Sequence, residues 1–147
     1  MAKKKRRSSV ESRSCGRDMK KICLGTDFLV ALLRGRKEAF EKAEEYDSIG
    51  AEISTTSINA FEIYLDAFKS REVEKKVKQA DGLLNSIKIP SLTLESSRKS
   101  GEILSRLISI RLPIDLRDAM IAGIILVNGY TLVTGNVEHL HFRRVTG

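Results

Sequence analysis

The sequence lacks several features that would assign it to a common class. No uninterrupted apolar run approaches the roughly 20 residues that a membrane-spanning helix needs, which excludes a transmembrane protein. The two cysteines, Cys15 and Cys23, form no zinc-type pair with a neighbour, and no apolar secretory segment follows the basic run at 3–7. We therefore expect a reducing, cytoplasmic compartment, in which Cys23 is a small buried hydrophobic residue.

Signatures of nucleotide-binding and nucleophilic enzymes are also missing. The chain contains no P-loop, no GxGxxG fingerprint and no GxSxG nucleophile elbow. Its two histidines, His139 and His141, are too few and too close together for a zinc site, and we interpret them as surface or loop residues. An unrelated receiver-like or nucleotide-binding α/β domain is disfavoured, because no phosphate-binding loop follows the first apolar segment.

The charge of the chain is concentrated at its beginning. Residues 1–21 carry nine basic and two acidic side chains, which accounts for the whole formal net charge of +7. The remaining residues, 22–147, carry 17 basic and 17 acidic side chains. Such a basic segment either holds phosphates through counterion release or is simply solvated. We expect residues 1–18 to be a disordered basic leader or an added extension, and residues 19–147 to form one domain.

Helical patterns and short apolar segments alternate through this domain. They predict helices at 28–35, 37–48, 57–70, 71–86, 93–111 and 115–129, strands at 21–25, 52–56, 87–90 and 131–134, and an edge strand at 142–145. Strands separated by helices pair in parallel, which predicts a three-layer α/β/α fold around a short parallel sheet. The 115–129 helix is apolar on every side from Ala119 to Val127, so it should be buried all round. Ligands of such sheets bind beyond the carboxyl ends of the strands.

Carboxylates stand where helices would otherwise place apolar side chains. Glu62 shares a helix face with Ile58 and Leu65, so it either lies at the edge of the apolar stripe or has a cation or hydrogen bonds nearby. We interpret Asp118, on the apolar face of the most hydrophobic helix, as a metal contact. Asp115, one turn earlier, is better placed as the helix N-cap. Such oxygen ligands suit Mg²⁺ or Mn²⁺, and phosphodiester hydrolysis is the usual chemistry of these sites.

Four segments, in order, carry a family resemblance that covers residues 19–146. They are KICLGTDFLVALLRG, ISTTSINAFEIYLDAFKS, LPIDLRDAMIAGIILVNGYTLVTGN and TGNVEHLHFRRV. These segments resemble the motifs of the PIN-domain nucleases and, within that family, the VapC-type toxin ribonucleases. The resemblance implies that Glu62 and Asp118 are family acidic residues, and that Thr134 and Asn136 match the closing motif.

The first motif departs from the family pattern. The family has Asp-Thr-Asn or Asp-Thr-Asp after the first strand, and its first Asp is a metal ligand. Here the triplet is Gly25-Thr26-Asp27, so Gly25 stands at the ligand position. Asp27 would point the same way as residue 25 in an extended segment, displaced by about 6 to 7 Å, and either replaces the ligand or supports the turn. The closing motif commonly has a further acid near His139, and the nearest one here is Glu138.

The resemblance implies a metal-dependent endoribonuclease acting on single-stranded RNA, with an antitoxin partner and a homodimeric assembly. The implied catalytic and metal-binding residues are Glu62, Asp118, Asp115 and Asp27, and those implied to position phosphate or metal-bound water are Thr26, Thr134 and Asn136. Mg²⁺ or Mn²⁺ would be the cofactor. The alternative is a catalytically degenerate PIN-like module that retains RNA or protein binding, since Gly25 removes one ligand.

Overall fold

The computed structural model describes residues 20–134, in which three strands alternate with six helices. The strands are β1 (Lys21–Leu24), β2 (Glu52–Ser54) and β3 (Thr131–Val133). The helices are α2 (Thr26–Leu33), α3 (Lys37–Ser48), α4 (Ser57–Lys69), α5 (Val73–Leu84), α6 (Leu94–Ser109) and α7 (Leu116–Asn128). Within this part of the chain, no helix is long and apolar enough to cross a membrane.

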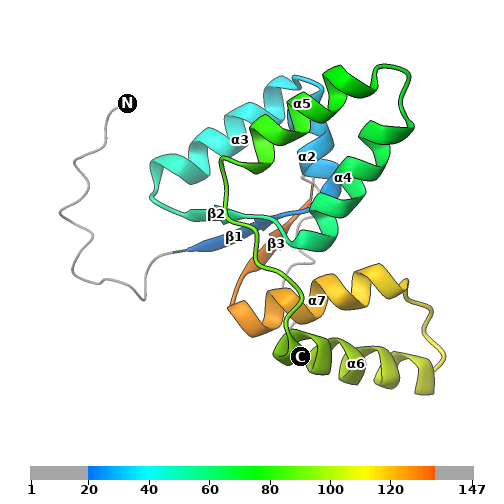
Figure 1. Ribbon diagram of the computed structural model, residues 1–147. Coiled ribbons are helices and arrows are strands. Elements are labelled where there is room, and N and C mark those ends of the chain that lie inside the picture. The colour runs from blue at the N-terminus through cyan, green and yellow to red at the C-terminus, as the bar shows by residue number, and fades with distance from the viewer. Residues whose placement is uncertain (1–19, 135–147) are drawn as a thin grey trace.

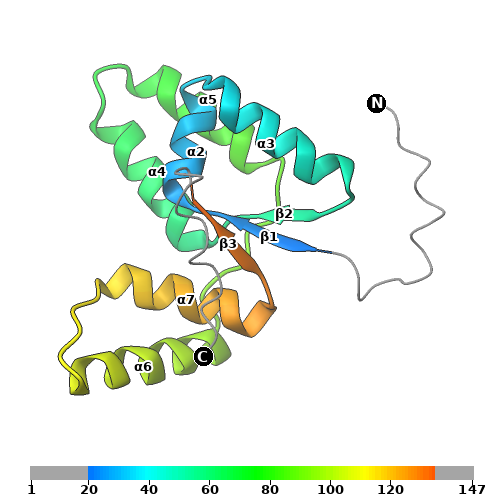
Figure 2. The ribbon, with the colours of Figure 1, turned by 180° about the vertical axis from the view of Figure 1, so that it is seen from behind.

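The sheet is parallel, with the order β2-β1-β3. Cys23, in the central strand, pairs with Ser54 on one side and Leu132 on the other. Helices α2 to α5 cover one face of the sheet, and the α6–α7 pair covers the other (Figure 1; Figure 2 shows the same layers from behind). This arrangement confirms the predicted three-layer α/β/α fold with a short parallel sheet.

Several predicted bounds differ from the structure by one or two residues, and two differences bear on the site. The 87–90 segment is no strand, because only Lys88 forms a parallel bridge, with Ser54. The carbonyl of Pro90 does not pair with β2. It accepts a hydrogen bond of 3.0 Å from the amide of Ser57 at the start of α4. Helix α2 begins at Thr26 rather than at residue 28, since the Gly25 carbonyl already accepts the first helical bonds. The expected strand at 142–145 lies outside the described residues.

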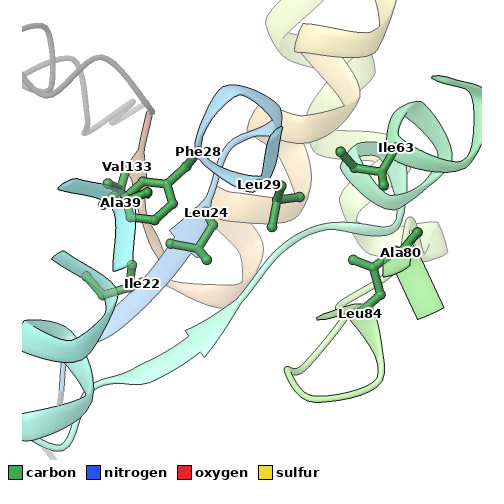
Figure 3. Close-up of a cluster of buried hydrophobic side chains, with 9 residues drawn as sticks. All are labelled: Ile22, Leu24, Phe28, Leu29, Ala39, Ile63, Ala80, Leu84 and Val133. Carbon is green, nitrogen blue, oxygen red and sulfur yellow. The ribbon is translucent and has the colours of Figure 1, made fainter. Parts of the chain in front are cut away.

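The larger core cluster lies between the sheet and the α2–α5 layer (Figure 3). Its buried members are Ile22, Leu24, Phe28, Leu29, Ala39, Ile63, Ala80, Leu84 and Val133. A second cluster joins Cys23 to Ile121 and Ile125 of α7. Cys23 is completely buried, as predicted, and that burial raises the pKa of its thiol to about 12. The prediction of a helix buried all round holds only in part. Buried residues are Ala119, Ile121, Gly123, Ile124 and Ile125, whereas Met120, Ala122, Leu126 and Val127 are partly exposed.

A glycine at the end of α7 directs the chain back into the sheet. Gly129 has a φ of 72°, the left-handed conformation that glycine adopts without steric cost. The chain then turns at Tyr130 and enters β3, which pairs with β1. As a result, Thr134 follows β3 at the same edge of the sheet at which Gly25 and Thr26 follow β1.

Candidate functional site

All the sequence-predicted site residues of the described chain except Asp115 line one cavity of about 560 Å³. It lies at the carboxyl ends of β1 and β3, where open α/β sheets place their ligands. Its polar lining consists of Thr26, Asp27, Asn59, Glu62, Asp118 and Thr134. Its apolar lining consists of Ile103, Leu107, Ile114, Ile121, Ala122, Ile125 and Leu132, and Gly25 completes the wall. The cavity is therefore polar at the strand ends and apolar toward α6 and α7.

A buried amide holds Glu62 in place through Thr26. The oxygen of Asn59 accepts hydrogen bonds from the backbone amide of Thr56 at 3.3 Å and from its hydroxyl at 2.7 Å, in a capping box at the start of α4. The Asn59 Nδ2 amide therefore faces Thr26 and donates to its Oγ1 at 2.9 Å. The Thr26 hydroxyl, whose oxygen is already accepting, donates its proton to Oε1 of Glu62.

Asn59 was not singled out as a site residue by the sequence analysis. It is 2% exposed, so its amide contacts protein rather than solvent. The signal that could have revealed it is the capping spacing from Thr56 to Asn59, which marks a helix start. That spacing carries no information about the contact with Thr26.

Arg117, also missed from the sequence, places a permanent cation beside the acidic residues. Its NH1 nitrogen lies 3.4 Å from Oε2 of Glu62, and its Nε lies 3.6 Å from Oδ2 of Asp115. The side chain of Glu62 is 22% exposed, and that of Arg117 is 43% exposed. Both carboxylate oxygens of Glu62 are thus engaged, one by Thr26 and one by Arg117.

The two aspartates at the start of α7 differ in their surroundings. Asp115 is the N-cap residue, as expected, but its side chain makes no capping hydrogen bond and lies beside Arg117 instead. Asp118 lines the cavity, where partial burial raises the pKa of its carboxyl group. The nearby charges of Asp115 and Glu62 raise this pKa further, and Arg117 partly offsets them. The side chain of Asp118 has no hydrogen bond or ion pair with any other residue of the 20–134 region.

Asp27 does not lie as the extended-segment argument required. Because α2 begins at Thr26, residues 25 and 27 are not two positions of one extended strand, and that reasoning was wrong. Asp27 occupies the first helical turn, where it lines the cavity but is exposed. Among the residues that the structure describes, the Asp27 side chain has no hydrogen-bond or ion-pair partner.

Gly25 lies in the wall of the cavity between β1 and β3. Its amide donates to the Val133 carbonyl at 2.8 Å, and its φ of −77° and ψ of 170° suit any residue. A Cβ atom added here would lie 3.3 Å from the Val133 oxygen and 3.8 Å from the Thr134 Cα. A side chain at residue 25 would therefore emerge beside Thr134. Strand β3 would have to move away by only a few tenths of an ångström to relieve the contact with the Val133 oxygen.

A family model for the PIN domain matches residues 22–146 of the sequence. The chain belongs to the PIN-domain family. A comparison with curated protein sequences finds no match.

Solved structures similar to this PIN domain include several that contain VapC proteins. VapBC2 from Rickettsia felis, bound to a promoter DNA fragment, has 24% identity and a TM-score of 0.73, covering 80% of this chain and 89% of that one. DNA-bound VapBC from Salmonella typhimurium has 21% identity and a TM-score of 0.70, with coverages of 84% and 93%. VapC20 from Mycobacterium tuberculosis, described as a toxin that cleaves the sarcin-ricin loop, has 16% identity and a TM-score of 0.55, with coverages of 74% and 84%. At these identities the likeness establishes the fold alone.

The site of this PIN domain offers oxygen ligands, the type that a hard divalent cation prefers, but too few of them are grouped together in the described part of the chain. Glu62, Asp115 and Asp118 offer carboxylate oxygens. Partial burial first, and then the charges of Asp115 and Glu62, raise the pKa of Asp118, and Arg117 offsets them only in part. However, within residues 20–134 no three Asp, Glu, His or Cys side chains are grouped closely enough to hold a metal ion. Thr134 lines the cavity, whereas Asn136, Glu138 and His139 lie outside the described residues.

Proposed function

We propose that this PIN domain is a VapC-type endoribonuclease for single-stranded RNA, weakened because Gly25 replaces the first acidic ligand. The observation that carries the proposal is the convergence of Glu62 and Asp118 on one cavity at the carboxyl ends of β1 and β3. Two carboxylates from different helices, together with Thr26 and Thr134, form the kind of polar, oxygen-rich site that phosphodiester hydrolysis uses. VapC20, which shares the fold, is described as a cleaving toxin.

Mg²⁺ or Mn²⁺ would be held by Glu62 and Asp118, with Asp115 nearby and Asp27 at the rim. When bound, such a cation lowers the pKa of a coordinated water and stabilises charge on a scissile phosphate. The Asn59–Thr26 hydrogen bonds fix the orientation of Glu62. Partial burial of Glu62, whose side chain is 22% exposed, strengthens its attraction to a cation. Thr134 and, by the family resemblance, Asn136 would position the RNA phosphate.

An antitoxin partner, a homodimeric assembly and a cytoplasmic location belong to the same proposal. The antitoxin partner is supported by the similarity to the VapBC structures of Rickettsia felis and Salmonella typhimurium, and to a structure described as a toxin-antitoxin complex from Klebsiella pneumoniae. The last has 18% identity and a TM-score of 0.61, and it covers 81% of this chain. The homodimer rests on the family resemblance, and the cytoplasmic location rests on the lack of an apolar secretory segment after the basic run at 3–7.

A second candidate function is a degenerate PIN module that binds RNA or protein without cleaving RNA. It is favoured by the absence of a carboxylate at Gly25 and by the lack of a group of three metal-ligating side chains within residues 20–134. The two candidate functions predict different results when an acid is restored at residue 25. A weakened ribonuclease regains RNA cleavage, whereas a degenerate module does not.

The test is cleavage of an end-labelled single-stranded RNA with and without Mn²⁺, by the native chain and by Gly25→Asp. We expect slow or undetectable cleavage by the native chain and Mn²⁺-dependent cleavage by Gly25→Asp. The matched control is Gly25→Asp combined with Glu62→Gln, which should abolish the restored cleavage. RNA binding without cleavage in Gly25→Asp would favour the degenerate module, and the absence of both would refute the proposed function.

A further inference from the structure

The acidic site contains its own cation. Asp115 and Glu62 flank the guanidinium of Arg117, at 3.6 Å and 3.4 Å, and Asp118 lies close enough for its pKa to respond to the same three groups. Two carboxylates therefore contact one arginine, and a third lies within its electrostatic reach. An arginine remains charged at every physiological pH, so this cation cannot leave by losing its proton.

Arg117 occupies the only oxygen of Glu62 that Thr26 leaves open. Thr26 donates to Oε1, and this bond is fixed by the buried amide of Asn59. The other oxygen, Oε2, is the one that Arg117 contacts. A metal ion that coordinates Glu62 through Oε2 would therefore compete with the guanidinium for that oxygen, because the two positive charges repel each other. Asp115 provides the released guanidinium with a partner already in place, at the exposed N-cap of the same helix.

We propose that Arg117 is an intramolecular counter-ion that competes with divalent cations for Glu62. Its charge partly balances the carboxylates of a site from which Gly25 has removed an acidic ligand. Metal binding is then linked to the loss of the contact between Arg117 and Glu62, while Arg117 keeps its contact with Asp115. The apparent affinity for metal is therefore lower than the carboxylates alone would give. This inference rests on the proposed function only in taking Glu62 as a metal ligand.

The experiment is a Mn²⁺ titration without RNA, followed by calorimetry or by the electron paramagnetic resonance of free Mn²⁺. The variants are Arg117→Gln and Arg117→Lys, each made in the native chain and in Gly25→Asp, so that a measurable affinity is available. We expect Arg117→Gln to tighten Mn²⁺ binding by about three- to tenfold, as the loss of one partly exposed positive charge beside a divalent ion should. Arg117→Lys keeps the charge and should stay within about twofold of its parent.

The matched control is Arg106→Gln, which removes an arginine that pairs with Glu102 at 3.0 Å on the exposed side of α6 and does not line the cavity. It changes the net charge equally but should alter Mn²⁺ affinity by less than about twofold, because exposed charges are screened over about 8–10 Å. Adding Glu62→Gln should cancel the tighter Mn²⁺ binding of Arg117→Gln, because the carboxylate for which Arg117 and the metal compete is then absent.

Two results would overturn the inference. One is unchanged or weaker Mn²⁺ binding in Arg117→Gln in both backgrounds, and the other is an equal gain in Arg106→Gln. The proposed ribonuclease activity is tested separately. If Arg117→Gln tightens Mn²⁺ binding while Gly25→Asp fails to cleave RNA, the counter-ion stands and the proposed function falls.

Discussion

Replacing Gly123 by alanine tests whether the close contact between α6 and α7 is essential to this fold. A Cβ atom at residue 123 would lie 2.0 Å from Oγ of Ser100, 2.6 Å from the carbonyl oxygen of Ser96 and 2.9 Å from the amide nitrogen of Ser100. The Ser100 hydroxyl can rotate away, but the two backbone atoms cannot. Since ordinary Cβ contacts lie at 3.4–4 Å, the helices would have to separate by roughly 0.8 Å at the Ser96 carbonyl.

Two opposing effects set the size of the expected change. Alanine is favoured over glycine inside a helix by about 1 kcal/mol, whereas overpacking a close contact costs about 1–3 kcal/mol or more when the backbone must move. We expect the net effect of Gly123→Ala to lower the free energy of unfolding by about 0–2 kcal/mol, measured by urea denaturation with an unchanged m-value.

The matched control for this prediction is Gly101→Ala in the neighbouring helix α6. No atom lies within 4 Å of a Cβ added at Gly101, so only the gain in helix propensity remains. This variant should raise the free energy of unfolding by about 0.5–1 kcal/mol. If Gly123→Ala were as stable as Gly101→Ala, the described packing of α6 on α7 would be wrong.

Three further predictions concern the site and the basic leader. Asp118→Asn should raise the melting temperature by about 1 to 4 °C at pH 7 without metal, and less at pH 4. Because the pKa of Asp118 is raised in the folded protein, its ionised carboxylate lowers the free energy of unfolding. This loss of stability is complete above the folded pKa and absent below the unfolded pKa. An equal rise in melting temperature at both pH values would contradict the prediction. Thr26→Val should lower the free energy of unfolding by about 1–3 kcal/mol in chemical denaturation, because it leaves the buried Asn59 amide without an acceptor, whereas Thr26→Ser should cost less than half as much. Deleting residues 1–18 should leave the melting temperature unchanged within a few degrees, as calorimetry can show, and a larger fall would mean that the leader packs on the domain.

The sequence predicted the fold well because its strongest signals are local. The 37–48 helix has the predicted bounds, since amphipathic spacing runs uninterrupted between Gly35 and Gly50, both of which have left-handed φ values. The segment at 87–90 reads as a strand by its apolar alternation, yet only Lys88 pairs with Ser54. Whether a short apolar segment becomes a strand depends on which neighbour offers hydrogen bonds, and that is a tertiary property.

The site was predictable only in part, for a related reason. Glu62 and Asp118 stand out because a carboxylate on an apolar helix face is locally anomalous. Arg117 carries no such signal, since charged residues are common near helix ends and its contact with Glu62 joins two different helices. Asn59 is similar: its spacing from Thr56 marks a helix start, but its bond to Thr26 spans 33 residues.

The most direct test of this account is the affinity of the native chain for Mn²⁺, compared with that of Gly25→Asp by calorimetry without RNA. A carboxylate at residue 25 would emerge beside Thr134, in the wall of the cavity that Glu62 and Asp118 also line, and it adds the negative charge on which hard-cation affinity depends. We predict that Gly25→Asp binds Mn²⁺ at least about tenfold more tightly than the native chain. Equal affinities, with both proteins folded, would contradict the claim that the site is one carboxylate short.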